Sequence, residues 1–134
     1  MTPSRSPFSY AVLRVVPDIE REEFLNAGLV LFCRSRRYLR ARASLDAERL
    51  RALRPDVPAD PIRAQLELVE RIAAGDVENG PLAEMSQSER FHWLTTPRST
   101  AVQPGPIHGG MSDDPEATFE HLFAALVDPA VGRP

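Results

Sequence analysis

Charged, hydroxyl, amide and imidazole side chains crowd into one stretch of the sequence, Glu89 to Pro104. The side chains there that could bind an anion together are Arg90, His92, Arg98, Ser99, Thr100 and Gln103. A guanidinium group binds phosphate or carboxylate through two parallel hydrogen bonds, and hydroxyl and backbone N–H groups complete such a cradle. The stretch therefore predicts an anion-binding or partner-binding loop. The alternative is that these side chains cap the ends of strands and helices, with Arg98 and its neighbours pairing with Glu89.

A second cluster consists of arginines spaced along one predicted hairpin. Its members are Arg34, Arg36, Arg37, Arg40 and Arg42, and Arg14 lies beside Arg40 or Arg42 if the first strand pairs with this hairpin. Such a stripe, together with Phe32 and Tyr38, could hold phosphates and stack bases. We include Arg14, Arg40 and Arg42 among the candidate site residues. The alternative is a solvated hairpin whose arginine stems cover the sheet and pair with acidic residues of 18–23 or of a helix.

Signals for catalysis are weak. His92 and His108 are the candidate proton carriers, and neither lies in a nucleophile motif. The sole cysteine, Cys33, excludes an internal disulfide and fits a small core residue. Asp113 and Asp114 could hold a metal ion with His108, but adjacent acids before a proline favour helix capping. We therefore assign no catalytic residue, no metal site and no cofactor.

The elements that must position these residues begin with strands. Residues Phe8 to Val16 are rich in aromatic and β-branched types and stop at Pro17, as expected of a strand. The acidic residues 18–23 that follow predict a turn or short helix. An apolar run, Leu29 to Cys33, and an alternating run, Arg37 to Ser44, predict a hairpin with one arginine-bearing face. Asn26 and Gly28 before it suggest a bulge or unusual backbone angles.

Helix signals follow the hairpin. Asp46, Asp60 and Asp114 are predicted N-caps, the second of them ahead of Pro61, and Gly75 is a predicted C-cap. Ser86 and Glu89 have the spacing of a capping box, which predicts a short helix that ends before Pro97. Residues 100–103 predict an edge strand, and the prolines and glycines of 104–110 predict an irregular loop.

These elements predict an α+β fold with one domain over residues 8–127 and tails at 1–7 and 128–134. We expect an antiparallel sheet of three or four strands. About three helices, beginning near Asp46, Asp60 and Asp114, are expected mainly on one face, which leaves the arginines on the other.

Composition narrows the classes of function. The chain has 134 residues, a net charge of -3, and only arginine among its 16 basic residues. The absence of lysine excludes Schiff-base chemistry and phosphate loops that end in Gly-Lys-Ser/Thr. A pI near 5.6 disfavours binding to nucleic acid but does not exclude it. Neither a membrane span nor a signal peptide is evident in the sequence, so we expect a cytoplasmic protein and no membrane partner.

Two ordered blocks of sequence carry a resemblance to a known family. The first covers Ser9 to Pro17 and Glu20 to Cys33, and the second covers Glu89 to Leu94 and Pro97 to Pro104. From Phe8 to about Val127 the chain resembles an uncharacterised bacterial family, domain of unknown function 3037. Members are often encoded beside a protein of the HipA-like kinase fold, and the resemblance therefore implies a small accessory or regulatory partner of such a protein. It attaches no catalytic role to any residue.

Three functional hypotheses follow. The leading one is a non-catalytic accessory module that binds a protein partner through the open sheet face and the region from Trp93 to His108. The alternative is a nucleotide-handling or nucleic-acid-processing protein in which Arg14, Arg90 and Arg98 hold phosphate and His92 or His108 moves a proton. A third is a homo-oligomer built on the hairpin edge.

Overall fold

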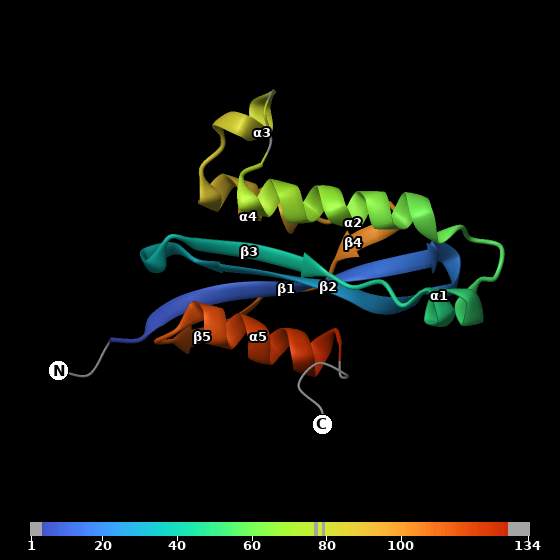
Figure 1. The fold of residues 1–134 in the computed structure, drawn as a ribbon, viewed down its shortest axis with the longest axis horizontal. Coiled ribbons are helices and arrows are strands. Elements are labelled where there is room, and N and C mark those ends of the chain that lie inside the picture. Colours follow the sequence, from blue (N-terminus) through green and yellow to red (C-terminus); the bar gives the residue numbers. More distant parts are fainter. Residues whose placement is uncertain (1–3, 77, 79, 129–134) are drawn as a thin grey trace.

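In a computed structural model, which describes residues 4–76, 78 and 80–128, one sheet lies between two layers of helices (Figure 1). The strands are β1 (Ser6–Asp18), β2 (Glu23–Cys33), β3 (Tyr38–Ala43), β4 (Val102–Pro104) and β5 (His108–Ser112). The helices are α1 (Ala47–Leu53), α2 (Ala59–Ala74), α3 (Pro81–Glu84), α4 (Gln87–Leu94) and α5 (Pro115–Leu126). The predicted α+β class is confirmed. Of the two predicted tails, residues 1–3 and 129–134 lie outside the described residues.

The long strand β1 is paired along both of its edges. The sheet is antiparallel, in the order β3-β2-β1-β4, and β5 also pairs with β1. β4 lies opposite the C-terminal half of β1 and β5 opposite its N-terminal half, so the two short strands follow one another along the same edge. Between them, the Gly105 N–H donates to the Val12 carbonyl at 2.7 Å. The predicted edge strand is confirmed beside β1, at residues 102–104 rather than 100–103.

The apolar sequence pattern divides the sheet into two buried faces. Ala11, Leu13 and Val15 of β1 are fully or almost fully buried beneath α1, α2 and α4. On the opposite face, Leu29 and Leu31 of β2 are covered by Phe119 and Phe123 of α5 and by Val127, which follows that helix. The alternation of side chains along a strand explains this division.

Three strands extend beyond the predicted residues or were not predicted. β1 covers Ser6–Asp18 and not Phe8 to Val16. β2 begins at Glu23 and not at Leu29, and the predicted loop 104–110 contains the start of β5 at His108. The loop prediction was wrong over this part because β5 is held by backbone pairing with β1, which demands no particular side chain. At Gly110, an added Cβ would lie 2.7 Å from the Phe8 ring, so the glycine makes room for that ring across the strand pair.

Local caps explain most helix boundaries. Asp46 accepts hydrogen bonds from the backbone of α1, and Asp114 accepts one from Ala117 of α5, as predicted. Gly75 ends α2 with a φ of 79°. The predicted cap at Asp60 was wrong: α2 begins at Ala59, and Pro58 precedes it without a side-chain cap.

The helix that begins after Asp114 does not join the others. Helices α1, α2 and α4 pack on one face of the sheet, whereas α5 packs on the other, below it in Figure 1. The helices do lie mainly on one face, but the arginine-bearing face is not left open. Helix α5 covers this face because its own apolar stripe packs on Leu29 and Leu31.

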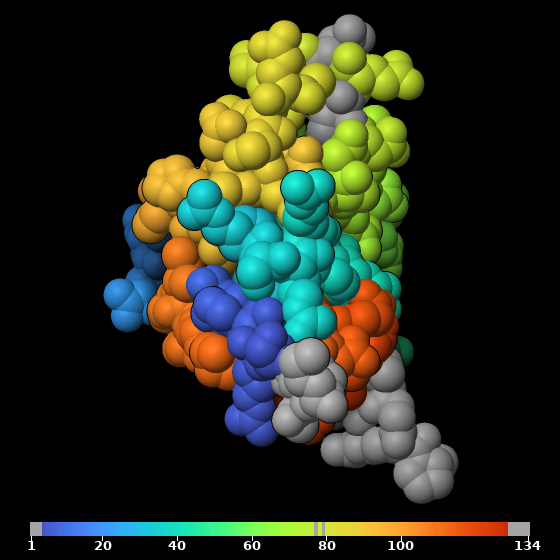
Figure 2. Space-filling view, turned by 90° about the vertical axis from the view of Figure 1, so that its left-hand side faces the viewer, coloured from blue at the N-terminus to red at the C-terminus, as the bar shows by residue number. Residues whose placement is uncertain are grey.

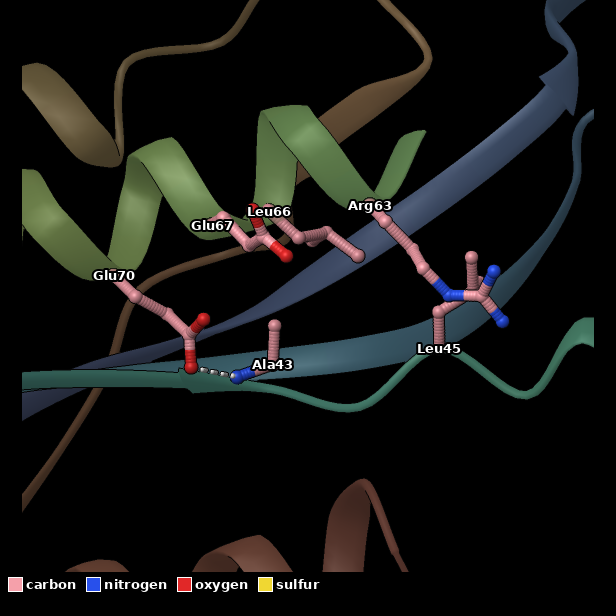
Figure 3. A pocket seen from close by; sticks show the side chains of 6 residues that line it. All are labelled: Ala43, Leu45, Arg63, Leu66, Glu67 and Glu70. Carbon is pink, nitrogen blue, oxygen red and sulfur yellow. Dashed lines mark hydrogen bonds between the residues drawn. The ribbon is translucent and has the colours of Figure 1, made fainter. Parts of the chain in front are cut away.

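Helix α2 also protects the outer edge of the sheet. The Glu70 carboxylate accepts a hydrogen bond from the Ala43 N–H at 3.1 Å, across a small hollow between α2 and β3 (Figure 3). Glu67, Leu66 and Arg63 line the same hollow from α2. An exposed strand edge presents unpaired backbone groups, and Glu70 occupies one of them.

The bulge predicted near Asn26 and Gly28 is present. The register of β1 with β2 shifts between Leu13 and Arg14, where Ala27 is the extra residue of β2. At Gly28 the backbones approach so closely that an added Cβ would lie 2.9 Å from Leu13 Cδ1 and 3.0 Å from the Arg42 carbonyl oxygen. A methyl group cannot enter this space unless the strands move apart.

Gly28→Ala should therefore lower the free energy of unfolding by about 1–3 kcal/mol, the usual cost of overpacking a core. Gly109→Ala in β5 is the matched control, since its added Cβ would meet only the Phe8 carbonyl oxygen at 3.4 Å. We expect the control to change stability by less than about 0.5 kcal/mol. Urea denaturation of both variants measures the difference, and equal effects would contradict the close approach at Gly28.

Candidate functional site

Helix α4 is the element that positions the polar stretch singled out in the sequence. Its N-terminus has the predicted capping box: Ser86 Oγ accepts from the Glu89 N–H at 3.2 Å, and the Glu89 carboxylate accepts from the Ser86 N–H at 3.1 Å. The hydrogen bond from the Ser86 backbone holds the pKa of Glu89 below its usual value. Phe91 and Leu94 anchor the inner side of α4 in the core. The helix is thus fixed at its start and along its buried side.

The outer side of α4 bears an open hollow of about 420 Å³. Its lining residues are Met85, Ser88, Glu89, His92, Trp93 and Thr96. Trp93 is half-buried, and it packs against the core while lining this hollow. The Arg98 guanidinium stacks on the Trp93 ring, 4.5 Å from its centroid. We call this region the α4 surface.

A second hollow adjoins the first at Ser88, which lines both. It lies between α4 and the turn that joins β2 to β3, and its lining residues are Phe32, Arg34, Arg37, Ser86, Gln87 and Ser88. Gln87 Nε2 donates to the Arg37 carbonyl at 3.0 Å and ties the turn to the helix. Figure 2 shows this turn, in cyan, beside the yellow atoms of α3 and α4. The sequence had not singled out Ser88, although its place in the capping-box turn puts it on the exposed side of α4.

The residues of the predicted anion cradle mostly bind their own backbone. Arg98 donates to the Trp93 carbonyl and, at 3.3 Å, to the Thr96 carbonyl, so it caps the end of α4. Thr100 Oγ1 donates to the Val102 carbonyl at 2.8 Å, and Gln103 Nε2 donates to the Thr100 carbonyl at 2.8 Å. Ser99 is exposed. These contacts match the alternative of capping, although Arg98 is not paired with Glu89.

Arg90 also serves α4. Its Nη1 donates to the Met85 carbonyl at 3.3 Å, and its guanidinium lies against Gly75, the C-cap of α2. A cation beside the C-terminus of a helix interacts favourably with the helix dipole. Both Arg90 and Arg98 thus have structural contacts that fix their side chains.

The arginines of β3 point at α5. Arg40 and Arg42 form ion pairs with Glu120, and Arg40 also pairs with Glu116. Their guanidinium groups stack on the Phe119 and Phe123 rings of α5 at 4.6 and 4.8 Å.

Tyr38 joins the same group, and its hydroxyl donates to Glu116 at 2.7 Å. Burial, with that hydrogen bond, raises the pKa of Tyr38 well above its usual value, so the hydroxyl keeps its proton. For Arg40 and Arg42, the structure thus matches the alternative in which the arginines pair with helix acids.

The remaining candidates lie on separate elements. His92 is exposed on α4, whereas His108 is on β5, where its ring lies 5.3 Å from that of Tyr10. Arg14 lies opposite Gln103 in the β1–β4 pair, as expected if the segment after Pro97 lies beside the first strand. The contacts of Arg98 are nevertheless made with α4, so the described contacts do not join Arg14 and Arg98 in one site.

Comparison with known proteins places the chain in a family. A family model described as protein of unknown function (DUF3037) matches residues 10–127. The chain belongs to this family. No curated protein and no solved structure matches it. The DUF3037 match covers the second sequence block in full and the first from Tyr10 onward, together with every helix of the described residues.

Two features are absent from the residues of the DUF3037 chain that the structure describes. These residues contain no cluster of three or more histidine, cysteine, aspartate or glutamate side chains suited to a metal ion. None of the helices in this part of the chain is long and apolar enough to cross a membrane.

The contact between β3 and α5 in this DUF3037 chain should make stability depend on pH. Hydrogen bonding to Arg42 holds the pKa of Glu120 below its ordinary value of 4.5. The ionised carboxylate therefore stabilises the fold above that value, and this contribution is lost as the pH falls through the lowered pKa. Glu120→Gln should be less stable than the wild type near neutral pH, and the gap should narrow as the pH falls from about 5 toward 2.

Urea titrations at several pH values measure this gap. Glu67→Gln is the control, because Glu67 is exposed on α2 and forms no ion pair within the described residues. A gap for Glu120→Gln that stayed constant across the acid range would show that the ion pair does not contribute.

Proposed function

We propose that this protein is a non-catalytic accessory module that binds a protein partner through the α4 surface. The observation that carries the proposal is the half-buried Trp93, which lines an open hollow while Arg98 stacks on its ring. Tryptophan and arginine are the residue types most enriched among those that dominate binding energy at protein interfaces.

The rigidity of the α4 surface supports the same proposal. The capping box fixes the start of α4, Arg98 caps its end, and Phe91 and Leu94 hold its inner side. A surface whose side chains are already ordered loses less conformational entropy when a partner binds. Hydroxyl, imidazole and carboxylate groups of Ser88, His92 and Glu89 around the hollow provide polar contacts at its rim.

The open sheet face that we expected to share this role is a weaker candidate over β3. Arg40 and Arg42 are engaged by the glutamates of α5, and the rings of Phe119 and Phe123 lie against them. A partner that binds there would have to displace α5 or compete with existing ion pairs. The binding role is therefore assigned to α4 alone.

The choice of partner to test comes from the family resemblance. It implies a HipA-like kinase-fold protein, which makes a purified HipA-like protein from the same genome the first partner to try. The alternative of a phosphate site built from Arg14, Arg90 and Arg98 has less support, because Arg90 and Arg98 donate to carbonyl oxygens of α4 and its flanking residues.

Ser88→Tyr is the variant that tests the α4 surface. Ser88 is exposed, lines both hollows and forms no side-chain hydrogen bond with the described residues. A tyrosine there fills the hollow without removing a contact of the fold. We expect its affinity for the HipA-like protein, measured by isothermal titration calorimetry, to fall by about tenfold or more.

Gln65→Tyr, on the exposed side of α2, is the matched control and should bind like the wild type. If Ser88→Tyr binds as tightly as the wild type, α4 is not the interface. If the wild type itself does not bind, the HipA-like partner is wrong.

A further inference from the structure

Three polar side chains form a row across the face of the sheet that α5 occupies, beside the C-terminal end of that helix. Arg14 of β1 lies opposite Asn26 of β2 on one side and opposite Gln103 of β4 on the other. Residues directly opposite in antiparallel strands point to the same face. At least one sequence neighbour of each is buried on the α2 side, which places the row on the α5 side; these neighbours are Leu13, Val15, Leu25, Ala27 and Val102.

The guanidinium of Arg14 is held in place by packing. It stacks over the Phe24 ring, 4.1 Å from the centroid, and its Nε and Cζ lie against the backbone of Gly105. A Cβ at Gly105 would approach Arg14 Nε to 3.1 Å, so the glycine allows this contact. Arg14 Nε is buried and has no hydrogen-bond partner among the described residues. The side chain therefore has a defined orientation with a strong donor group unsatisfied.

Arg14 differs from the other arginines that line this face. Arg40 and Arg42 form ion pairs with carboxylates of α5, whereas Arg14 forms none with the residues that the structure describes. A partly buried guanidinium without a carboxylate lacks the partner that normally offsets its loss of hydration. Its two Nη atoms form a fork that matches the two oxygens of a carboxylate.

The two amides flanking Arg14 are also oriented. Asn26 Nδ2 donates to the Leu126 carbonyl at 3.0 Å, and Gln103 Nε2 donates to the Thr100 carbonyl at 2.8 Å. Each amide is thus turned so that its nitrogen serves the fold. The carboxamide oxygens have no hydrogen bond to a described group and can accept one from a ligand N–H.

We propose that Arg14, Asn26 and Gln103 form a binding site for a carboxylate that carries a neighbouring amide N–H, the group found in an N-acylated amino acid and at a peptide C-terminus. Arg14 binds the carboxylate, and an amide oxygen accepts from the N–H. The Phe24 ring, 45% exposed, contacts an apolar side chain of the ligand. This site lies on the opposite face of the sheet from α4, and it does not rest on the function proposed above.

The test compares two probes, N-acetylphenylalanine and N-acetylphenylalanine amide. They differ at one group, which is a charged carboxylate in the first and a neutral carboxamide in the second. Binding is followed by NMR through the backbone amide resonances of residues 14, 26 and 103, which the wild type and every variant retain. We expect a saturable shift with the acid and none with the amide. Equal shifts with both probes, or none with the acid, would overturn the proposal.

Variants locate the site. Arg14→Lys keeps the charge but loses the fork, and it should weaken binding of the acid by about tenfold or more. Gln103→Ala, which leaves Arg14 intact, should weaken it several-fold. Arg51→Lys is the matched control, since Arg51 is exposed on α1 and does not line the hollow that Phe24 borders, and it should bind like the wild type. Unchanged binding in both Arg14→Lys and Gln103→Ala would overturn the assignment, and the comparison of acid with amide stands even if Arg14→Lys fails to fold.

Two further probes identify the source of the carboxylate. Inorganic phosphate that bound as tightly as the acid would overturn the assignment to a carboxylate. An acetylated tetrapeptide ending in phenylalanine that bound more tightly than N-acetylphenylalanine would support a peptide C-terminus as the ligand. Equal binding of the two would support the small N-acylated amino acid.

Discussion

The pairing of β1 along both of its edges is the constraint on which the rest of the structure depends. β2 lies along one edge, and β4 and β5 lie in succession along the other. The chain between β3 and β4 crosses one face of the sheet, where α1, α2 and α4 pack, before it returns to β1. Because side chains alternate along a strand, the register of β1 decides at once which residues enter the core and which, Arg14 among them, lie on the other face.

The features that could be predicted from the sequence are those held by contacts between near neighbours in the chain. The capping box of Ser86 and Glu89 and the caps at Asp46 and Asp114 each join residues a few positions apart, so a short pattern suffices to find them. β5 could not be found in this way. It is formed by hydrogen bonds to β1, and the Phe8 ring covers Gly110 from a strand about a hundred residues earlier.

The contact between α5 and β3 shows why a correctly predicted helix could still be placed on the wrong face. Glu116 and Glu120 are one turn apart on α5, a rise of about 6 Å. Arg40 and Arg42 are two residues apart on β3, a rise of about 6.6 Å. The two spacings match, and the rings of Phe119 and Phe123 meet the arginine stems. The sequence of α5 or of β3 alone does not reveal that the glutamate and arginine spacings match. The match appears only when the fold brings the two elements together.

An arginine-rich sequence reveals little of a binding site, because it does not show which acceptors each arginine meets. Arginine is one residue type with one charge, but the acceptors it meets are supplied by segments distant in sequence. At β3 they are carboxylates of a helix, and at Arg98 they are carbonyl oxygens at the end of α4. At Arg14 the neighbours across the strands are two amides whose nitrogens already donate elsewhere. Among the described residues, the charge of Arg14 therefore lacks the carboxylate that β3 receives from α5. We infer that this difference in partners, and not in residue type, separates a structural arginine from one that can bind a ligand.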